Sequence, residues 1–271
     1  MGKKLPYSVG KNKTKEGYQL YLLIDVGNTH TTIGKSDGQK IISNWRIGTK
    51  RFDTEDELYS ILKSLEILDD INKVAVASVV PSVDKSIQYF CKKYFGFMPV
   101  FVNALECKTI NWNVKYPKEI GADRVANVLA AYKLFKTNAI IVDFGTAITI
   151  DVLVDNNYEG GAILPGFSTS VMALFANTAK LPQVDLKVLS TPIGKDTEEN
   201  IQIGVVVGTI KAIDCLIEDI INFTNENFLV IATGGNSIIS KEISKHIEIV
   251  DHQLTLKGIL EFAKCCFKEG E

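Results

Sequence analysis

The sequence predicts an α/β fold that consists of two tandem copies of one unit, with a ligand cleft between them. An apolar strand that ends in an Asp-x-Gly-polar turn occurs at residues 23–29 and again at residues 141–147. In both places two further strands, then helices and a buried strand, are expected in the same order. Because a chance match of a few residues rarely carries the same downstream order, we interpret the repetition as an internal duplication.

The first copy is expected to occupy residues 19–137. It opens with an apolar strand at 19–24, and the next two strands are joined by Asp37-Gly38, a pair typical of a hairpin turn. The apolar pattern then predicts a helix, a buried strand, a second helix and a short strand. The ranges expected after the first strand are 30–35, 40–47, 54–68, 74–79, 83–95 and 100–102, followed by a helix at 124–136.

The second copy is expected to occupy residues 138–271. Its strands are predicted at 139–142, 147–154, 158–164 and 228–232, and its main helices at 169–180 and 198–223. Gly204 and Gly208 lie four residues apart on the second of these helices. Glycine weakens a helix, so the pair predicts close approach by another element, either of this chain or of a second copy.

The composition limits the function classes that fit. Hydrophobic residues make up 46% and charged residues 23%, and the net charge of −2 argues against a nucleic-acid-binding protein, which usually carries a basic stripe. No apolar run approaches the roughly 18 residues of a membrane span, and no signal-peptide core is present. Five cysteines without C-x-x-C spacing and three scattered histidines favour reduced thiols over a disulfide framework or a zinc site. We therefore expect a cytoplasmic protein that binds neither membrane nor nucleic acid.

Residues 1–18 differ from the rest of the chain. They hold five lysines against one acid, with little apolar content. This composition predicts a flexible N-terminal tail, and a nucleic-acid-binding arm is the weaker alternative.

The two Asp-x-Gly turns carry the main chemical prediction. Each places a carboxylate, Asp25 or Asp143, at a sheet edge beside a glycine that lets a ligand approach the backbone. If the two turns face each other across a cleft, they suit the phosphates of a nucleotide and Mg²⁺. The side chains of Asn28, Thr29 and Thr146 would then donate hydrogen bonds to the phosphate oxygens. One such turn alone is more often an ordinary strand end, whereas two in matching positions favour the functional interpretation.

Two further loops are candidates for the site. Gly234-Gly235, between a strand and a helix, would let an adenine ring lie on the backbone, although an ordinary strand–helix connection is equally open. Asp123 and Arg124 begin a helix, which suggests a proton acceptor and an anion-binding group; a favourable charge at the helix start is the alternative. Walker A and G-x-G-x-x-G sequences are both missing, so other nucleotide-binding folds lose their main support.

The motifs taken together resemble those of type III pantothenate kinases. They are, in order, residues 25–29, Tyr116, 121–124, 143–146, 160–166, 178–182, Thr197 and 233–236, and they extend from residue 20 to about 260. The resemblance implies two tandem RNase H-like domains of the actin-like ATPase fold with a nucleotide cleft between them. It also implies transfer of the γ-phosphoryl group of ATP to the 4′-hydroxyl of pantothenate, the first step toward coenzyme A. Mg²⁺ with ATP, K⁺ or NH₄⁺, and a homodimer are implied as well.

The resemblance also assigns roles to residues, which are grouped here by ligand. The ATP-binding set, with the glycine pair included, is Asp25, Val26, Gly27, Asn28, Thr29, His30, Thr31, Thr32, Thr146, Gly234 and Gly235. The pantothenate-binding set is Tyr116, Gly121, Ala122, Asp123, Arg124 and Thr197, with Asp123 as the catalytic proton acceptor. Asp143 is implied to bind the monovalent cation.

Departures from the family pattern are mild, and two other functions stay open. Ile148, Ile150 and Phe167 replace residues that are common in the family, and they are interpreted as tolerated apolar exchanges. Another actin-like small-molecule kinase, such as a sugar kinase, would share the turns but should lack Tyr116 with the Gly-Ala-Asp-Arg motif. A non-catalytic regulator on the same scaffold could lose its carboxylates, whereas all three are present here.

Overall fold

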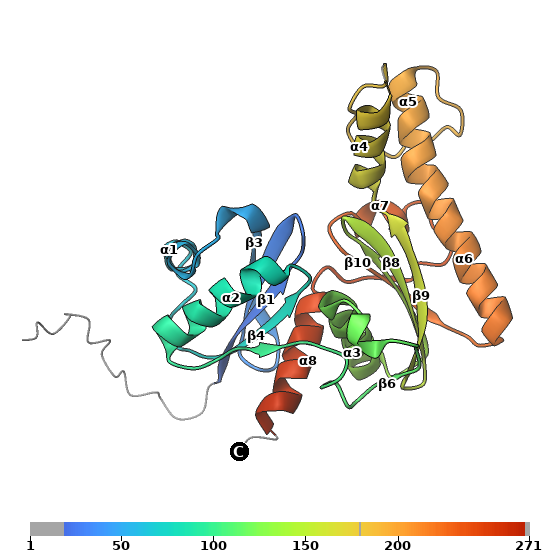
Figure 1. The fold of residues 1–271 in the computed structure, drawn as a ribbon. Helices are drawn as coiled ribbons and strands as arrows, with labels where there is room; N and C mark the ends of the chain where they lie inside the picture. Colours follow the sequence, from blue (N-terminus) through green and yellow to red (C-terminus); the bar gives the residue numbers. More distant parts are fainter. Residues whose placement is uncertain (1–18, 179, 269–271) are drawn as a thin grey trace, which may run out of the picture.

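The computed structural model describes residues 19–178 and 180–268, and Figure 1 shows two sheets with helices around and between them. The tail expected at residues 1–18 lies outside the described residues, so that expectation stays a prediction.

The first sheet holds five strands in the order β3-β2-β1-β4-β5. Strands β1 to β3 are antiparallel neighbours, and β4 and β5 run parallel to β1. The central strand β1 is almost continuously apolar because both of its faces are covered, as is typical of parallel pairing. The bounds are β1 (Leu20–Val26), β2 (His30–Ser36), β3 (Ile41–Gly48), β4 (Ile71–Ser78) and β5 (Val100–Phe101).

Two helices cover one face of this sheet. They are α1 (Glu55–Ser64) and α2 (Pro81–Phe90), and α2 continues into a π-helical turn, η2 (Cys91–Phe95). Their apolar side chains pack on β1 and β4 in one core cluster. Helix α1 ends four residues before the predicted position because Glu66 takes a left-handed backbone conformation, with φ of 56°.

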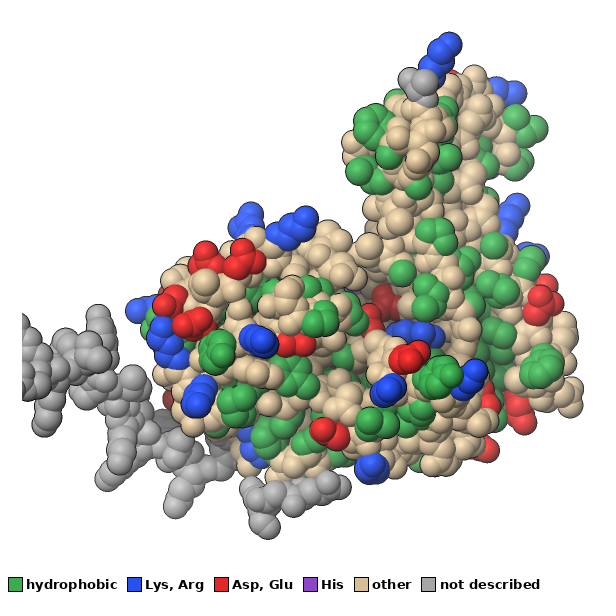
Figure 2. Space-filling view, viewed as in Figure 1, with side chains coloured by type: hydrophobic (Ala, Val, Ile, Leu, Met, Phe, Trp, Pro, Cys, Tyr) green, Lys and Arg blue, Asp and Glu red, His purple; other side chains and the backbone are tan. Residues whose placement is uncertain are grey.

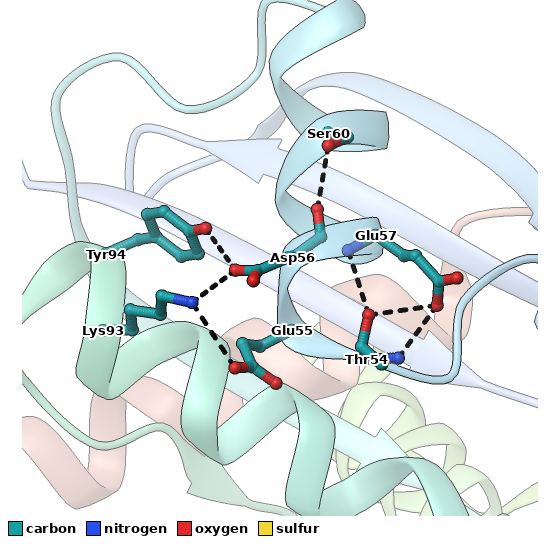
Figure 3. Close-up of polar contacts among 7 residues, drawn as sticks. All are labelled: Thr54, Glu55, Asp56, Glu57, Ser60, Lys93 and Tyr94. Atoms are coloured by element: carbon teal, nitrogen blue, oxygen red, sulfur yellow. Dashed lines mark hydrogen bonds and ion pairs between the residues drawn. The ribbon is translucent and has the colours of Figure 1, made fainter.

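The start of α1 was predicted correctly because Thr54 is its N-cap (Figure 3). The Thr54 hydroxyl accepts a hydrogen bond from the amide of Glu57 at 3.3 Å, and the Glu57 carboxylate accepts one from the amide of Thr54 at 3.0 Å. This reciprocal capping box satisfies donors that the first turn would otherwise leave unpaired. Lys93 and Tyr94 of η2 both bind Asp56, so the first turn of α1 is also fastened to the neighbouring helix.

The second sheet repeats the strand order of the first. Its order is β11-β10-β7-β8-β9-β6, so β7, β8, β9, β10 and β11 correspond to the five strands of the first sheet. The repeat predicted from the two turns is thereby confirmed at the level of topology. The bounds are β6 (Asn111–Trp112), β7 (Ala139–Phe144), β8 (Ala147–Val154), β9 (Asn157–Pro165), β10 (Leu229–Thr233) and β11 (Ile249–Val250).

The two halves exchange elements across the predicted boundary at residue 137. Strand β6 precedes that boundary yet pairs with β9, and the last helix, α8 (Leu254–Lys268), packs on β1 and β4 of the first sheet. Helix α3 (Ala122–Phe135) packs along α8, and Figure 1 shows this pair between the sheets. Their core cluster contains residues of both sheets. The boundary itself stays a prediction about the sequence copies.

One long helix covers the outer face of the second sheet. Segments α5 (Thr197–Gln202), η4 (Ile203–Val207) and α6 (Gly208–Thr224) follow one another without a break, as the sequence predicted. By length and composition alone this helix could cross a membrane, although Lys211 and Asp214 interrupt its apolar sequence. Its buried side chains pack with the strands of the second sheet.

Two shorter helices complete the second half. Helix α4 (Phe167–Asn177) and the start of α5 extend beyond the second sheet, whereas α7 (Ser237–Lys241) follows β10 (Figure 1). The loop that leads into α7 forms part of the cleft described below.

The contact between α3 and α8 generates a stability prediction. A Cβ atom at Gly258 of α8 would lie 1.8 Å from the carbonyl oxygen of Ala126 in α3, so only glycine permits this crossing. We expect Gly258→Ala to push the helices apart and to lower the free energy of unfolding by about 1–3 kcal/mol. Denaturant titration measures this value.

The matched control for that prediction is Gly208→Ala. The nearest atom to a Cβ there is 3.8 Å away, and the position is helical, so alanine should be neutral or stabilising by about 0.4–1 kcal/mol. Equal unfolding free energies for the two variants would contradict the tight crossing.

Candidate active site

A cleft of about 420 Å³ lies between the two sheets. Figure 2 shows it as a hollow where the two halves meet, with acidic side chains inside. One wall comes from the turn after β1 and from β2 and β3. The other comes from the turn after β7, the start of β8 and the loop after β10, and the first residues of α3 and α8 close the floor. The two copies therefore contribute equivalent elements to one hollow.

The first turn presents Asp25 at the end of β1. The amide of Gly27 donates to the carbonyl oxygen of His30 at 3.0 Å, which closes the turn and directs residues 28–30 into the cleft. The Thr49 hydroxyl donates to the carbonyl oxygen of Gly27 at 2.7 Å and shares a hydrogen bond with buried Thr31. Thr31 thus supports the turn from behind.

The second turn has the same construction. The amide of Gly145 donates to the carbonyl oxygen of Ala147 at 3.1 Å, and Asp143 stands at the end of β7. The hydroxyls of Thr29 and Thr146 meet across the cleft at 3.1 Å. The two turns that were predicted to face each other are therefore in direct contact.

Most of the predicted site residues line this one cleft. They are Asp25, Gly27, Asn28, Thr29, His30, Thr32, Asp123, Asp143, Thr146, Gly234 and Gly235. Val26 and Thr31 do not line it because their side chains are buried in the first half. Among the proposed pantothenate residues, Asp123 lines this cleft and Thr197 lines a second hollow, whereas Tyr116, Gly121, Ala122 and Arg124 line neither of the two.

Three carboxylates converge in the cleft, and burial and the charge of Asp123 raise the pKa of the other two. Withdrawal from water, and then the charges of Asp123 and Asp143, hold the pKa of Asp25 well above its usual range, against the opposing charge of Arg46. Withdrawal from water and the Asp123 charge raise the pKa of Asp143 to about 7, against a hydrogen bond from Asn127. Such a cluster is relieved by a bound cation or by protonation.

Asp123 occupies the first turn of α3. Its Oδ1 atom accepts a hydrogen bond from the amide of Arg124 at 2.8 Å, and a Cβ at Gly121 would lie 2.5 Å from that oxygen. Glycine at 121 therefore makes room for the carboxylate. Withdrawal from water raises the pKa of Asp123, although the Arg124 amide opposes the shift.

Arg124 belongs to a buried network that the sequence analysis did not foresee. Its Nε and Nη2 atoms lie 2.9 Å and 2.8 Å from Oδ1 of Asp151, and Nη2 donates to the Tyr158 hydroxyl at 2.8 Å. The Asp151 side chain is fully buried, so this pairing offsets a charge that would otherwise be costly. The sequence feature that could have predicted this network is Asp151, an acidic residue in the middle of the apolar strand 147–154.

Asn127 is a second residue that the sequence analysis missed. Its amide donates to Oδ2 of Asp143 at 3.0 Å, and its oxygen accepts from the Thr255 hydroxyl at 2.8 Å. These bonds fix the orientation of the amide and of the Asp143 carboxylate. Its spacing could have predicted a place in the site, because Asn127 follows Asp123 by one helical turn on the same face of α3.

Thr233 is a third missed residue. It lines the cleft at the register position opposite Asp143, and its hydroxyl oxygen is buried without a hydrogen-bond partner among residues 19–178 and 180–268. A buried hydroxyl of this kind points to a ligand that would complete its bonding.

Tyr116 and Thr197 lie outside the cleft. Tyr116 is exposed beside the short helix η3 (Pro117–Glu119). Thr197 lines a second hollow, of about 740 Å³, between α4 and α5. The two hollows adjoin, because Thr169 of the second donates to the carbonyl oxygen of Thr146 at 2.6 Å. The proposed substrate roles of Tyr116 and Thr197 stay predictions.

Comparisons with known proteins agree with this architecture. A family model described as type III pantothenate kinase matches residues 21–219. A type III pantothenate kinase of Kosmotoga olearia is 47% identical over 248 residues, which cover 90% of this chain and 95% of that protein.

Solved structures show the same fold at low identity. A conserved putative Baf family transcriptional activator from Campylobacter jejuni has a TM-score of 0.58 at 22% identity, covering 91% of this chain and 99% of that one. A ROK family glucokinase from Streptomyces griseus, in complex with glucose and AMPPNP, has a TM-score of 0.54 at 10% identity, again covering 91% and 99%. The predicted fold of two tandem actin-like units is confirmed. Together with the family match and the 47% relative, it shows that the chain belongs to the type III pantothenate kinase family.

Proposed function

We propose that this protein binds ATP in the cleft between the two sheets and phosphorylates pantothenate there, with Asp123 as proton acceptor. Family membership makes it a pantothenate kinase, which forms 4′-phosphopantothenate in the first step of coenzyme A biosynthesis. The observation that carries the site assignment is the convergence of Asp25, Asp123 and Asp143, from two repeated turns and a helix start, in one cleft.

The nucleotide is placed by the loops that line the cleft. Backbone amides of the two turns, with the side chains of Asn28, Thr29 and Thr146, hold the phosphates. The adenine ring lies on the Gly234-Gly235 loop, where Gly234 has φ of 89° and a Cβ would lie 2.4 Å from Oδ1 of Asp143. Phosphoryl transfer depends mainly on positioning and charge neutralisation, which these groups can supply.

The carboxylates fit the metal ions that a kinase of this family implies. Oxygen donors that repel one another suit Mg²⁺ and a monovalent cation, and their raised pKa values indicate that positive charge would stabilise the cleft. Asp25 serves the Mg²⁺ that is bound with ATP. Asp143 and the Thr233 hydroxyl, which has no hydrogen-bond partner among the described residues, hold K⁺ or NH₄⁺. Mg²⁺ bound with ATP neutralises charge on the phosphates.

Asp123 takes the proton of the pantothenate hydroxyl as the new P–O bond forms. Burial raises the pKa of Asp123 toward neutral pH, and a general base is most effective when its pKa lies near the working pH. Arg124 stays paired with Asp151, and its Nη1 atom, which makes no hydrogen bond among the described residues, faces an anionic group of pantothenate.

A second copy of the chain covers the hollow between α4 and α5. Met172 and Phe175 of α4 are exposed apolar side chains there, and a Cβ at Gly204 would meet nothing within 4 Å. Docking on this surface brings the partner close to Thr197 and to the adjoining cleft, which accounts for a substrate role of Thr197. The dimer works in the cytoplasm.

The assembly prediction concerns mass and one substitution. We expect light scattering at micromolar concentration to return about twice the 29.9 kDa of one chain. Phe175→Glu should shift the mass toward the monomer, because a charge would be buried in the interface. Phe223→Glu on an exposed position of α6 is the control and should leave the dimer intact. A monomeric wild type would contradict the proposal.

The catalytic prediction concerns Asp123→Asn. This change keeps the shape and removes the proton acceptor, so turnover should fall by at least about a hundredfold while Mg²⁺-ATP affinity stays within a few-fold. Coupled ADP-release assays with pantothenate and with a sugar panel measure turnover and substrate class. Asp219→Asn, at an exposed position outside the cleft, is the control. A variant with lower stability but nearly normal turnover would assign Asp123 to the helix start instead.

The cation prediction concerns Asp143→Asn. K⁺ should raise the melting temperature of the wild type above its value in Na⁺, and it should not do so in the variant. The pKa of about 7 also sets a pH dependence, because an acid with a raised folded-state pKa stabilises the protein at low pH. That stability is lost as pH rises from the ordinary pKa of 3.8 to about 7, so the variant should gain stability relative to wild type across this range. Wild-type K⁺ stabilisation in the variant would refute the assignment.

A further inference from the structure

Arg46 ends a row of side chains that starts at the first catalytic turn. In the sheet register Asp25 of β1 is opposite Thr32 of β2, and Thr32 is opposite Arg46 of β3. Side chains of directly opposite residues stand on the same face, so all three belong to one side of the sheet. All three line the cleft, and the row therefore carries an arginine to its edge.

The charge of Arg46 has no acidic partner. Among the residues that line the cleft it is the only lysine or arginine, beside three carboxylates. It forms no ion pair within the part of the chain that the structure describes, although its charge lowers the pKa of Asp25. An exposed arginine in this position retains most of its donors for a ligand.

The hydrogen bond between Arg46 and His30 sets the tautomer of His30. Nη2 of Arg46 lies 3.0 Å from Nδ1 of His30. Because a guanidinium can only donate, Nδ1 must accept, and the neutral imidazole carries its proton on Nε2. Partial burial and the Arg46 charge both lower the pKa of His30, which keeps the ring neutral. Two donors, the guanidinium and Nε2–H, are therefore available side by side.

Arg46 also reaches the opposite wall of the cleft. A Cβ at Gly235 would lie 3.2 Å from Nη1 and 3.7 Å from Cζ, so the guanidinium lies against the backbone of the glycine loop. Arg46 belongs to the first sheet and Gly235 follows β10 of the second. The side chain thus spans the space in which the phosphates of a nucleotide are placed.

We propose that Arg46, together with Nε2–H of His30, binds phosphoryl oxygens of the nucleotide and links the first sheet to the glycine loop of the second. The inference rests on the nucleotide site proposed above. A guanidinium fork matches phosphate geometry and supplies charge-assisted hydrogen bonds. It provides the fixed positive charge that a P-loop lysine provides in other nucleotide-binding proteins, in a cleft whose lining residues include no lysine.

The test is Arg46→Gln, with Mg²⁺-ATP affinity measured by displacement of a fluorescent ATP analogue in the absence of pantothenate. Loss of charge-assisted bonds should weaken ATP binding by about 10- to 100-fold. Arg51→Gln, the same change at an exposed position outside the cleft, should stay within about twofold of wild type. Arg46→Lys keeps the charge but loses the fork, so its affinity should lie between the two.

The outcomes separate this inference from the proposed function. ATP affinity of Arg46→Gln within about twofold of wild type would overturn the inference. Arg46→Lys binding no more tightly than Arg46→Gln would also overturn it, because the loss would then be structural. A wild-type protein that binds no Mg²⁺-ATP would instead contradict the proposed function itself.

Discussion

The close crossing of α3 and α8 sets the distance between the two sheets. Gly258 permits it, since any side chain there would collide with the backbone at Ala126. Both helices also deliver site residues, because α3 carries Asp123 and Asn127 and α8 carries Thr255. The packing that joins the halves therefore also positions the groups on the floor of the cleft. A shift of α8 would move the support of the Asp143 carboxylate as well as the hydrophobic core.

The charged groups of the cleft are placed for ligands, and this placement lowers the stability of the protein when no ligand is bound. Asp25 and Asp143 have raised pKa values, which means that the folded protein holds these carboxylates in unfavourable surroundings. Asp151, by contrast, has an ion pair with Arg124 and a hydrogen bond from Tyr158 within the protein, although burial raises its pKa too. The contrast separates a structural ion pair from groups that are left for substrate and cations, a separation that is typical of functional sites.

The sequence predicted the fold well because its signals are local. Asp-x-Gly turns, the Asp37-Gly38 hairpin pair and strand-length apolar runs each depend on a few neighbouring residues. The missed residues depend on the register between strands or on helix packing. Arg46 reaches the cleft only because β3 pairs with β2 in one register, and Asp151 meets Arg124 only after α3 docks on the second sheet. Likewise, the placement of Thr197 in a separate hollow depends on how α4 and α5 project from the sheet.

The docking of α8 on the first sheet has a consequence for biosynthesis. Tyr21, Leu23 and Ala75 of that sheet share a core cluster with α8, which follows both of their strands and the whole second sheet in the sequence. While the chain emerges from a ribosome, the inner face of the first sheet must therefore remain without one of its covering layers. Domains generally fold as units from the N-terminus during translation, but here completion of the first unit awaits the synthesis of α8. Until then a nascent chain would expose an apolar surface of the kind that molecular chaperones bind.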